Sequence, residues 1–274
     1  MEVVKDLRRL FPTVMDRAYE QSKEFRLVND IMSPDVITIS PEASMDEATK
    51  TMGDKHIGSL IVMKNGEPIG IVTERDLLSR VLAHGLNHKK VNVEKVMSSP
   101  LISIDPSATI KEAAQTMIKE KGRLAVFDSG ELVGIVTASD LIKTMPQVAE
   151  TLLKVDDFMT RKVITADEKT AVSIIMKVMG EERIGSVVIT REGKPMGIFT
   201  ERDLLTTFLA RDRSLGIQVG EACSSPLIAI PSLTTVNETA YVMASKHIRR
   251  LPVAENGDLV GIITARDLVA AYAR

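Results

Sequence analysis

The stretch GIITARD, residues Gly261–Asp267, occurs three more times in the chain with small changes, and this repetition constrains the fold more than any other feature. The glycines that begin the four copies stand at positions 70, 134, 197 and 261, in steps of 64, 63 and 64 residues. A fixed period of this length indicates a tandem repeat in which each copy is one supersecondary unit. The 274-residue chain is therefore expected to contain four similar units.

Each repeat shows the same order of predicted elements. A short β-branched segment predicts an opening strand, and apolar residues at helical spacing predict a helix after it. Two apolar runs then flank a tight turn, which predicts a β-hairpin, and the heptapeptide leads from the second run into another apolar helical run. The opening strands are Pro34–Ile39, Pro100–Ile104, Lys162–Thr165 and Pro226–Ile230, and the turns are Asn65-Gly66, Ser129-Gly130, Glu192-Gly193 and Asn256-Gly257. The unit is thus β-α-β-β-α.

The start of the first helix carries a capping box in three repeats. Its pairs are Ser44 with Glu47, Thr109 with Glu112 and Thr235 with Glu238. In such a box the hydroxyl and the carboxylate each accept from a backbone amide of the other residue. Repeat three has Thr170 and Ser173 at the corresponding positions and lacks the box.

The repeats form two similar halves. Repeat one resembles repeat three, and repeat two resembles repeat four, at an offset of 127 residues between Thr73 and Thr200 and between Thr137 and Thr264. A single repeat buries little core, so two repeats are expected to pack as one module. The expected divisions are a helical extension at 1–27 and repeats at 28–84, 90–148, 152–212 and 216–274. The extension is interpreted as a helix packed on the first module, with a partner-binding arm as the alternative.

Composition excludes several classes of protein. The net charge is −2, Trp is absent and aromatic residues make up 3% of the chain, which argues against a nucleic-acid platform. There is no run of 18 apolar residues and no signal peptide, so we expect a cytoplasmic protein without a membrane span. Four His and one Cys without metal-ligand spacing give no reason to expect a metal, even though His56 and His247 are equivalent. The lone Cys223 is interpreted as a small core residue.

The β-α-β-β-α unit, its Gly-h-h-Thr-x-x-Asp end and the pairing of units resemble CBS domains, over residues 28 to 274. The resemblance implies an α+β fold of four tandem CBS units that pair through their sheets into two Bateman modules, in a flat disk. It also implies binding of an adenine nucleotide (AMP, ADP or ATP), or of S-adenosylmethionine, in clefts between paired units. No cofactor is required.

The resemblance assigns roles to particular residues. The motif Asp would hold the ribose hydroxyls and the motif Thr would contact phosphate, while the first strand and the strand before the hairpin turn would enclose the adenine. The ribose and phosphate candidates are Thr73, Asp76, Thr137, Asp140, Thr200, Asp203, Thr264 and Asp267. The cationic phosphate partners are Arg75, Arg123, Arg202, Arg249, Arg250 and Arg266. The adenine pocket candidates are Ile37, Ile102, Ile164, Ile228, Leu124, Leu251 and Pro252.

The heptapeptide also has a purely structural interpretation, because Thr-x-x-Asp before an apolar run is a helix cap that needs no ligand. Its Gly would let either backbone or ligand approach closely. Repeats one and three carry Glu74 and Glu201 inside the motif, and a carboxylate is unfavourable near phosphate unless it turns away. We therefore favour clefts that use repeats two and four, where Arg123, Arg249 and Arg250 supply cations.

These observations favour a regulatory protein that senses an adenine nucleotide and transmits the energy state to a partner protein, and that could form a homodimer. The alternative is an interaction scaffold without a ligand. The chain shows no catalytic motif of the phosphate-loop, serine-hydrolase, zinc-protease or cysteine-histidine type, so we expect no enzyme activity and no catalytic residue.

Overall fold

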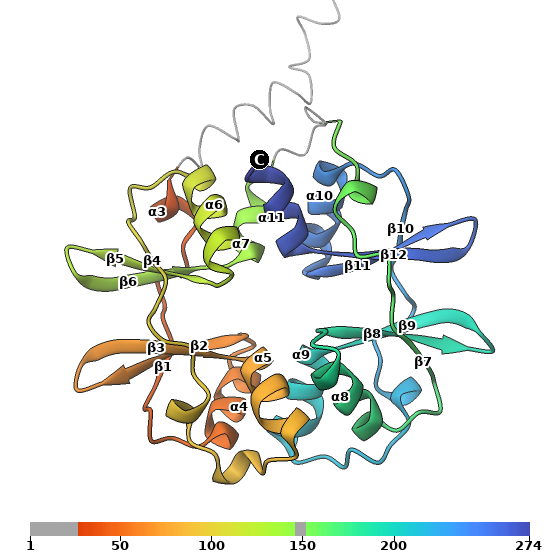
Figure 1. The fold of residues 1–274 in the computed structure, drawn as a ribbon, viewed down its shortest axis with the longest axis horizontal. Helices are drawn as coiled ribbons and strands as arrows, with labels where there is room; N and C mark the ends of the chain where they lie inside the picture. The colour runs from red at the N-terminus through yellow and green to blue at the C-terminus, as the bar shows by residue number, and fades with distance from the viewer. Residues whose placement is uncertain (1–26, 146–151) are drawn as a thin grey trace, which may run out of the picture. The chain divides into compact units, whose positions relative to one another are not determined.

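The computed structural model describes residues 27–145 and 152–274, and it contains four copies of the expected β-α-β-β-α unit (Figure 1). The expected helical extension lies outside the described residues, apart from Leu27. Every repeat has a three-stranded sheet in which the opening strand lies parallel to the first hairpin strand and the two hairpin strands are antiparallel. The α+β fold class predicted from the repeats is confirmed.

The first two repeats have the following elements. Repeat one consists of β1 (Thr38–Ile39), α4 (Met45–Asp54), β2 (Ser59–Lys64), β3 (Glu67–Thr73) and α5 (Glu74–Asp76), and the chain then winds on through Leu77–Val81 and Leu82–His84. Repeat two consists of β4 (Ser103–Ile104), α6 (Ile110–Glu120), β5 (Leu124–Asp128), β6 (Glu131–Val136) and α7 (Ala138–Lys143).

The second half repeats this order. Repeat three consists of β7 (Thr165–Asp167), α8 (Val172–Glu181), β8 (Ser186–Arg191), β9 (Lys194–Thr200) and α9 (Glu201–Asp203), followed by a π-helix at Leu204–Phe208 and a 3-10 helix at Leu209–Arg211. Repeat four consists of β10 (Ile230–Pro231), α10 (Val236–Lys246), β11 (Arg250–Glu255), β12 (Asp258–Thr264) and α11 (Ala265–Tyr272). A short helix, α3 (Val28–Ile31), precedes repeat one.

The predicted turns and caps form as expected, with one correction. Both residues of each hairpin turn have positive φ, for example 52° at Asn65 and 86° at Gly66, which is the type I′ geometry that matches strand twist. The capping box closes at Ser44, Thr109 and Thr235. In repeat three the residue at the cap is Ala171, one position later than the Thr170 considered from the sequence, and no side chain caps α8.

The described residues cluster into two compact units, each made of two repeats. The two–four unit contains the described residues up to Pro34, from Ile102 to Lys162 and from Ala229 onward, and the one–three unit contains Asp35–Leu101 and Val163–Ile228. Within each unit the repeats pack through helices: α10 and α11 pack against α6 and α7 in one unit, and α4 and α8 pack against the helical turns of the opposite repeat in the other. Helix contacts therefore join repeats two and four, and likewise repeats one and three.

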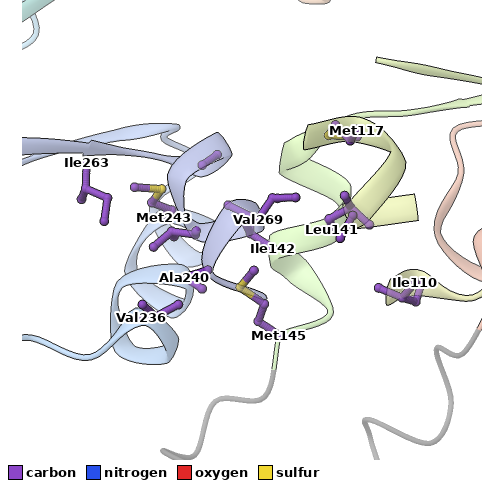
Figure 2. Packing of buried hydrophobic residues seen from close by; sticks show 14 of the residues in the cluster. Ile110, Met117, Leu141, Ile142, Met145, Val236, Ala240, Met243, Ile263 and Val269 are labelled. Atoms are coloured by element: carbon purple, nitrogen blue, oxygen red, sulfur yellow. The ribbon is translucent and has the colours of Figure 1, made fainter. Parts of the chain in front are cut away.

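A single apolar core fills the centre of the two–four unit. Figure 2 shows side chains of α6 and α7, such as Met117 and Leu141, facing those of α10 and α11, such as Met243 and Val269. All four are almost fully buried. The Met residues therefore pack in the core, as their helical spacing predicts. The one–three unit has an equivalent core with Met45, Phe199 and Phe208 among its largest fully buried side chains.

A short segment before each opening strand docks on the sheet of another repeat, which the sequence did not predict. Ser33 exchanges two backbone hydrogen bonds with Ile135 of β6, at 2.9 and 3.0 Å. The same exchange joins Ser98 with Ile71, Thr160 with Ile262 and Ser224 with Ile198. In every case the sheet residue follows the heptapeptide Gly. The segment before repeat one thus docks on the sheet of repeat two, and the segment before repeat two docks on the sheet of repeat one. Repeats three and four exchange their segments in the same way.

Candidate functional site

The heptapeptide Gly is required by this docking contact. A Cβ added at Gly197 would lie 2.7 Å from the carbonyl oxygen of Ser224, and one at Gly70 would lie 2.8 Å from that of Ser98. At Gly134 and Gly261 the nearest atom is a methionine sulfur, of Met32 and Met159. Of the two possibilities left open by the sequence, a close approach of backbone or of ligand, the structure shows the approach of backbone.

The Thr and Asp of the heptapeptide form a closed helix cap in all four repeats. In repeat four, Asp267 Oδ2 accepts from the backbone N–H of Thr264 at 2.8 Å and from its hydroxyl at 2.7 Å. The backbone N–H of Ala265 donates to the Arg249 carbonyl at 2.9 Å. The Thr hydroxyl proton is thus directed at the carboxylate, and donation to a phosphate would require the cap to open. We therefore no longer assign the motif Thr as a phosphate donor.

The second oxygen of each motif Asp lies outside the cap, and its surroundings differ between repeats. Asp76 Oδ1 lies 3.3 Å from Arg80 Nη1, and Asp140 Oδ1 lies 3.3 Å from Lys143 Nζ. Asp267 has Ala270 and Ala271 at the corresponding positions of its helix, so the next turn supplies no cation. Since a carboxylate oxygen can accept more than one hydroxyl, the outward oxygen of Asp267 is better placed for ribose than those of Asp76 and Asp140.

Arg250 is brought next to the same cap by strand register. It is the cross-strand partner of Thr264 in the antiparallel pairing of β11 with β12. Directly opposed residues project on the same face of a sheet, and so does Pro252, two positions along β11. Pro252 is in turn the partner of Ile262. This face therefore carries a cation beside the carboxylate of the cap, which are the charged groups that phosphate and ribose need, while Pro252 itself is buried.

The other predicted cations have different settings. Arg123 directly precedes β5, at the position in repeat two that Arg250 occupies in repeat four, and it is partly buried. Arg249 is partly buried and contributes its carbonyl to the cap, and Arg266 Nη1 lies 3.4 Å from the carbonyl of Lys121.

In the one–three unit the motif arginines contact carboxylates. Arg75 Nε lies 3.2 Å from Glu201 Oε1, and Arg202 Nε lies 3.5 Å from Glu74 Oε1. We therefore assign these two arginines as ion-pair partners of the glutamates and not as phosphate partners.

The adenine candidates divide into two groups. Leu124 and Leu251 are completely buried in the helix-lined core of the two–four unit, on the face opposite to Arg250 and Pro252, so an adenine ring cannot reach them and we withdraw both. The carbonyls of Ile37, Ile102 and Ile164 accept backbone hydrogen bonds from Ile61, Ala125 and Val188 where the parallel strand pairs begin, and their side chains are partly buried. Ile228 is 42% exposed.

Two further sequence hypotheses concern Cys223 and the histidines. Cys223 packs beside the core of the one–three unit, and burial raises the pKa of its thiol, which lowers its reactivity as a nucleophile. Within residues 27–145 and 152–274, no three His, Cys, Asp or Glu side chains gather in a way that could hold a metal ion. Over the same residues, no helix has the length and hydropathy needed to cross a bilayer.

Comparison with known proteins identifies the family. The CBS domain model matches residues 28–83, 93–147, 155–210 and 219–274. The chain belongs to the CBS domain family. It is 32% identical over 196 residues to the uncharacterized protein MJ1225 of Methanocaldococcus jannaschii, an alignment that spans 66% of this chain and 69% of the relative. It is also 35% identical over 115 residues to the CBS domain-containing protein YhcV of Bacillus subtilis, covering 42% of this chain and 81% of the relative.

A crystal structure of the Methanocaldococcus protein, described as a candidate archaeal homologue of γ-AMPK, superposes with a TM-score of 0.74 at 22% identity. The superposition covers 90% of this chain and all of the other. It supports the tandem CBS fold. None of these relatives is named as an enzyme.

Proposed function

We propose that this CBS protein is a regulatory sensor that binds an adenine nucleotide (AMP, ADP or ATP), with repeat four as its principal site. The observation that carries the proposal is the junction of β11, β12 and α11, where the outward oxygen of Asp267 and the side chain of Arg250 flank one closed cap. The carboxylate would accept the ribose hydroxyls, and Arg250 would pair with phosphate. The description of a fold neighbour as a γ-AMPK homologue is consistent with this ligand class.

A signal would arise if the bound and free forms differ in affinity for a partner protein. Binding at the cap fixes the start of α11, whose residues Leu268 and Val269 belong to the buried core shared with repeat two. A ligand at repeat four would therefore act on the packing that joins the two repeats. The regulated partner would read that change.

Isothermal titration calorimetry and thermal unfolding with AMP, ADP, ATP and S-adenosylmethionine test the proposal. A ligand at 100 times its Kd should raise the free energy of unfolding by about 2.7 kcal/mol. If S-adenosylmethionine binds more tightly than the nucleotides, the ligand class is S-adenosylmethionine and not an adenine nucleotide. The absence of any heat or thermal shift at millimolar concentration would leave the scaffold interpretation, which the closed caps of all four repeats already satisfy.

The variant Asp267→Asn locates the site. The amide oxygen can still accept from Thr264, while the NH2 group replaces the outward acceptor, so the cap survives and the ribose contact does not. Nucleotide affinity should fall by about 10- to 100-fold, the value of a hydrogen bond to a charged group. The matched control is Asp76→Asn, because Asp76 Oδ1 already faces Arg80. An equal or larger effect of the control would refute the assignment to repeat four.

A further inference from the structure

Two reciprocal ion pairs join repeats one and three. Glu74, the residue after the cap Thr in repeat one, forms an ion pair with Arg202 of repeat three, and Glu201 forms one with Arg75 of repeat one. The two glutamate side chains are 3% and 8% exposed, whereas the arginines are 38% and 54% exposed. Each carboxylate therefore lies inside the protein, and each guanidinium covers it from the solvent side.

Repeats two and four have a different set of residues at these positions. Ala138 and Ala265 replace the glutamates, and Ser139 and Arg266 replace the arginines. The fifth and sixth residues of the heptapeptide, the two after the cap Thr, thus carry no net charge in repeats one, two and three and one positive charge in repeat four. The Thr–Asp cap closes in all four repeats, so the difference in charge comes from these two side chains, although the chain continues as a π-helical turn in repeats one and three and as an α-helix in repeats two and four.

The ion pairs lie within one helical turn of the positions in repeats one and three that correspond to the proposed site in repeat four. Glu74 adjoins Thr73 and stands two residues before Asp76, and Glu201 has the same relation to Thr200 and Asp203. A phosphate at either junction would meet a buried carboxylate and would have to draw an arginine away from it. Removing one partner of a buried ion pair leaves an uncompensated charge and is unfavourable.

We infer that Glu74 and Glu201 are specificity-determining residues that exclude anionic ligands from repeats one and three and restrict them to the two–four unit. They do so by their own buried charge and by holding Arg75 and Arg202 in ion pairs, whereas the motifs of repeats two and four have alanine at the glutamate position. The inference rests on the proposed function for the ligand class. It concerns how the repeats are selected, which can be measured separately.

One substitution should transfer the exclusion to the two–four unit. By the equivalence of repeats, Ala138→Glu places a carboxylate opposite Arg266, as Glu74 is placed opposite Arg202. In calorimetric titration with AMP, this variant should bind about 10-fold or more weakly than the wild type, the loss expected for a charge-assisted contact. Ala138→Gln has nearly the same size without the charge and should retain wild-type affinity. Equal losses in both variants would assign the effect to packing and overturn the inference.

The opposite experiment removes the exclusion. The double variant Glu74→Gln, Glu201→Gln keeps an oxygen for each arginine and removes both negative charges. It should bind AMP at additional sites, and Asp76→Asn with Asp203→Asn in the same background should remove them. A double variant that binds no more AMP than the wild type overturns the inference, whether or not the wild type binds. AMP binding by the double variant alone would instead refute the proposed site in repeat four and support the exclusion.

Discussion

The substitution Gly197→Ala tests whether the docking segments hold the sheets together. The new Cβ would lie 2.7 Å from the carbonyl oxygen of Ser224 and 2.8 Å from Cys223 Sγ, whereas ordinary contacts begin near 3.4 Å. The nearest atom belongs to the backbone, so a side-chain rotation cannot relieve the contact, and residues 223–224 must move away from β9.

The cost follows from what that movement breaks. Ser224 and Ile198 exchange backbone hydrogen bonds of 2.9 and 3.0 Å, and each contributes about 0.5–1.5 kcal/mol to stability. Replacing Gly with Ala restricts the unfolded chain and returns about 0.4–1 kcal/mol. The net loss in the free energy of unfolding should therefore be about 1.3 kcal/mol, within a range of about 0–2.6 kcal/mol.

Urea denaturation followed by circular dichroism measures this difference. The matched control is Gly216→Ala, where Ser214 Oγ at 3.4 Å is the one neighbour of the added Cβ within 4 Å among the described residues, and it should raise stability by about 0.4–1 kcal/mol. Gly261→Ala should cost less than Gly197→Ala, because its nearest neighbour is the end of the flexible Met159 side chain. If Gly197→Ala is as stable as Gly216→Ala, the docking contact does not explain the glycine.

Three further predictions concern the core, a missing cap and an acidic cap. Met243→Ala should lower the free energy of unfolding by about 2–5 kcal/mol, because Met243 is 1% exposed in the shared core, and equal losses for Met243→Ala and the half-exposed Tyr241→Ala would contradict that placement. Ala171→Ser supplies the cap that α8 lacks and should raise the free energy of unfolding by about 0.5–1 kcal/mol, whereas an unchanged or lower value would show that the introduced hydroxyl does not cap the helix. The hydroxyl and the backbone amide of Thr235 lower the pKa of Glu238 in the folded state, so its contribution is present at neutral pH and is lost as the pH falls below about 4.3. Glu238→Gln should therefore be less stable than wild type at pH 7 and equal to it in acid, and a pH-independent difference in denaturation midpoints would argue against the charge.

The sequence was sufficient to predict the β-α-β-β-α unit but not which repeats contact one another. Local chemistry determines the element order, because capping boxes, paired positive-φ turns and period-3.6 apolar residues act within a few positions of the chain. The long-range contacts had weaker signals. A Met or Cys followed by Ser or Thr stands before every opening strand, at Met32-Ser33, Met97-Ser98, Met159-Thr160 and Cys223-Ser224, but this recurrence does not say which sheet receives the segment.

The candidate site was predictable to a similar degree. The motif Asp and the Arg opposite the cap Thr follow from alignment of the repeats. The burial of Leu124 and Leu251 was accessible in principle, since strand residues alternate between faces, but the sequence does not say which face meets the helices. The ion pairs of Glu74 and Glu201 join residues more than a hundred positions apart, and no local pattern predicts them.

The exchange of docking segments bears on how such a chain could have arisen. Ser33 docks on the sheet of repeat two and Ser98 docks on that of repeat one, so the smallest piece in which both sheets carry their docking segment is a pair of consecutive repeats. That pair would still expose the helix faces which, in the present chain, repeats three and four cover. Two copies of an ancestral pair could cover each other about a twofold axis. Gene duplication and fusion would then have joined the copies, after which Arg266 and the alanines of repeats two and four were free to diverge from their counterparts.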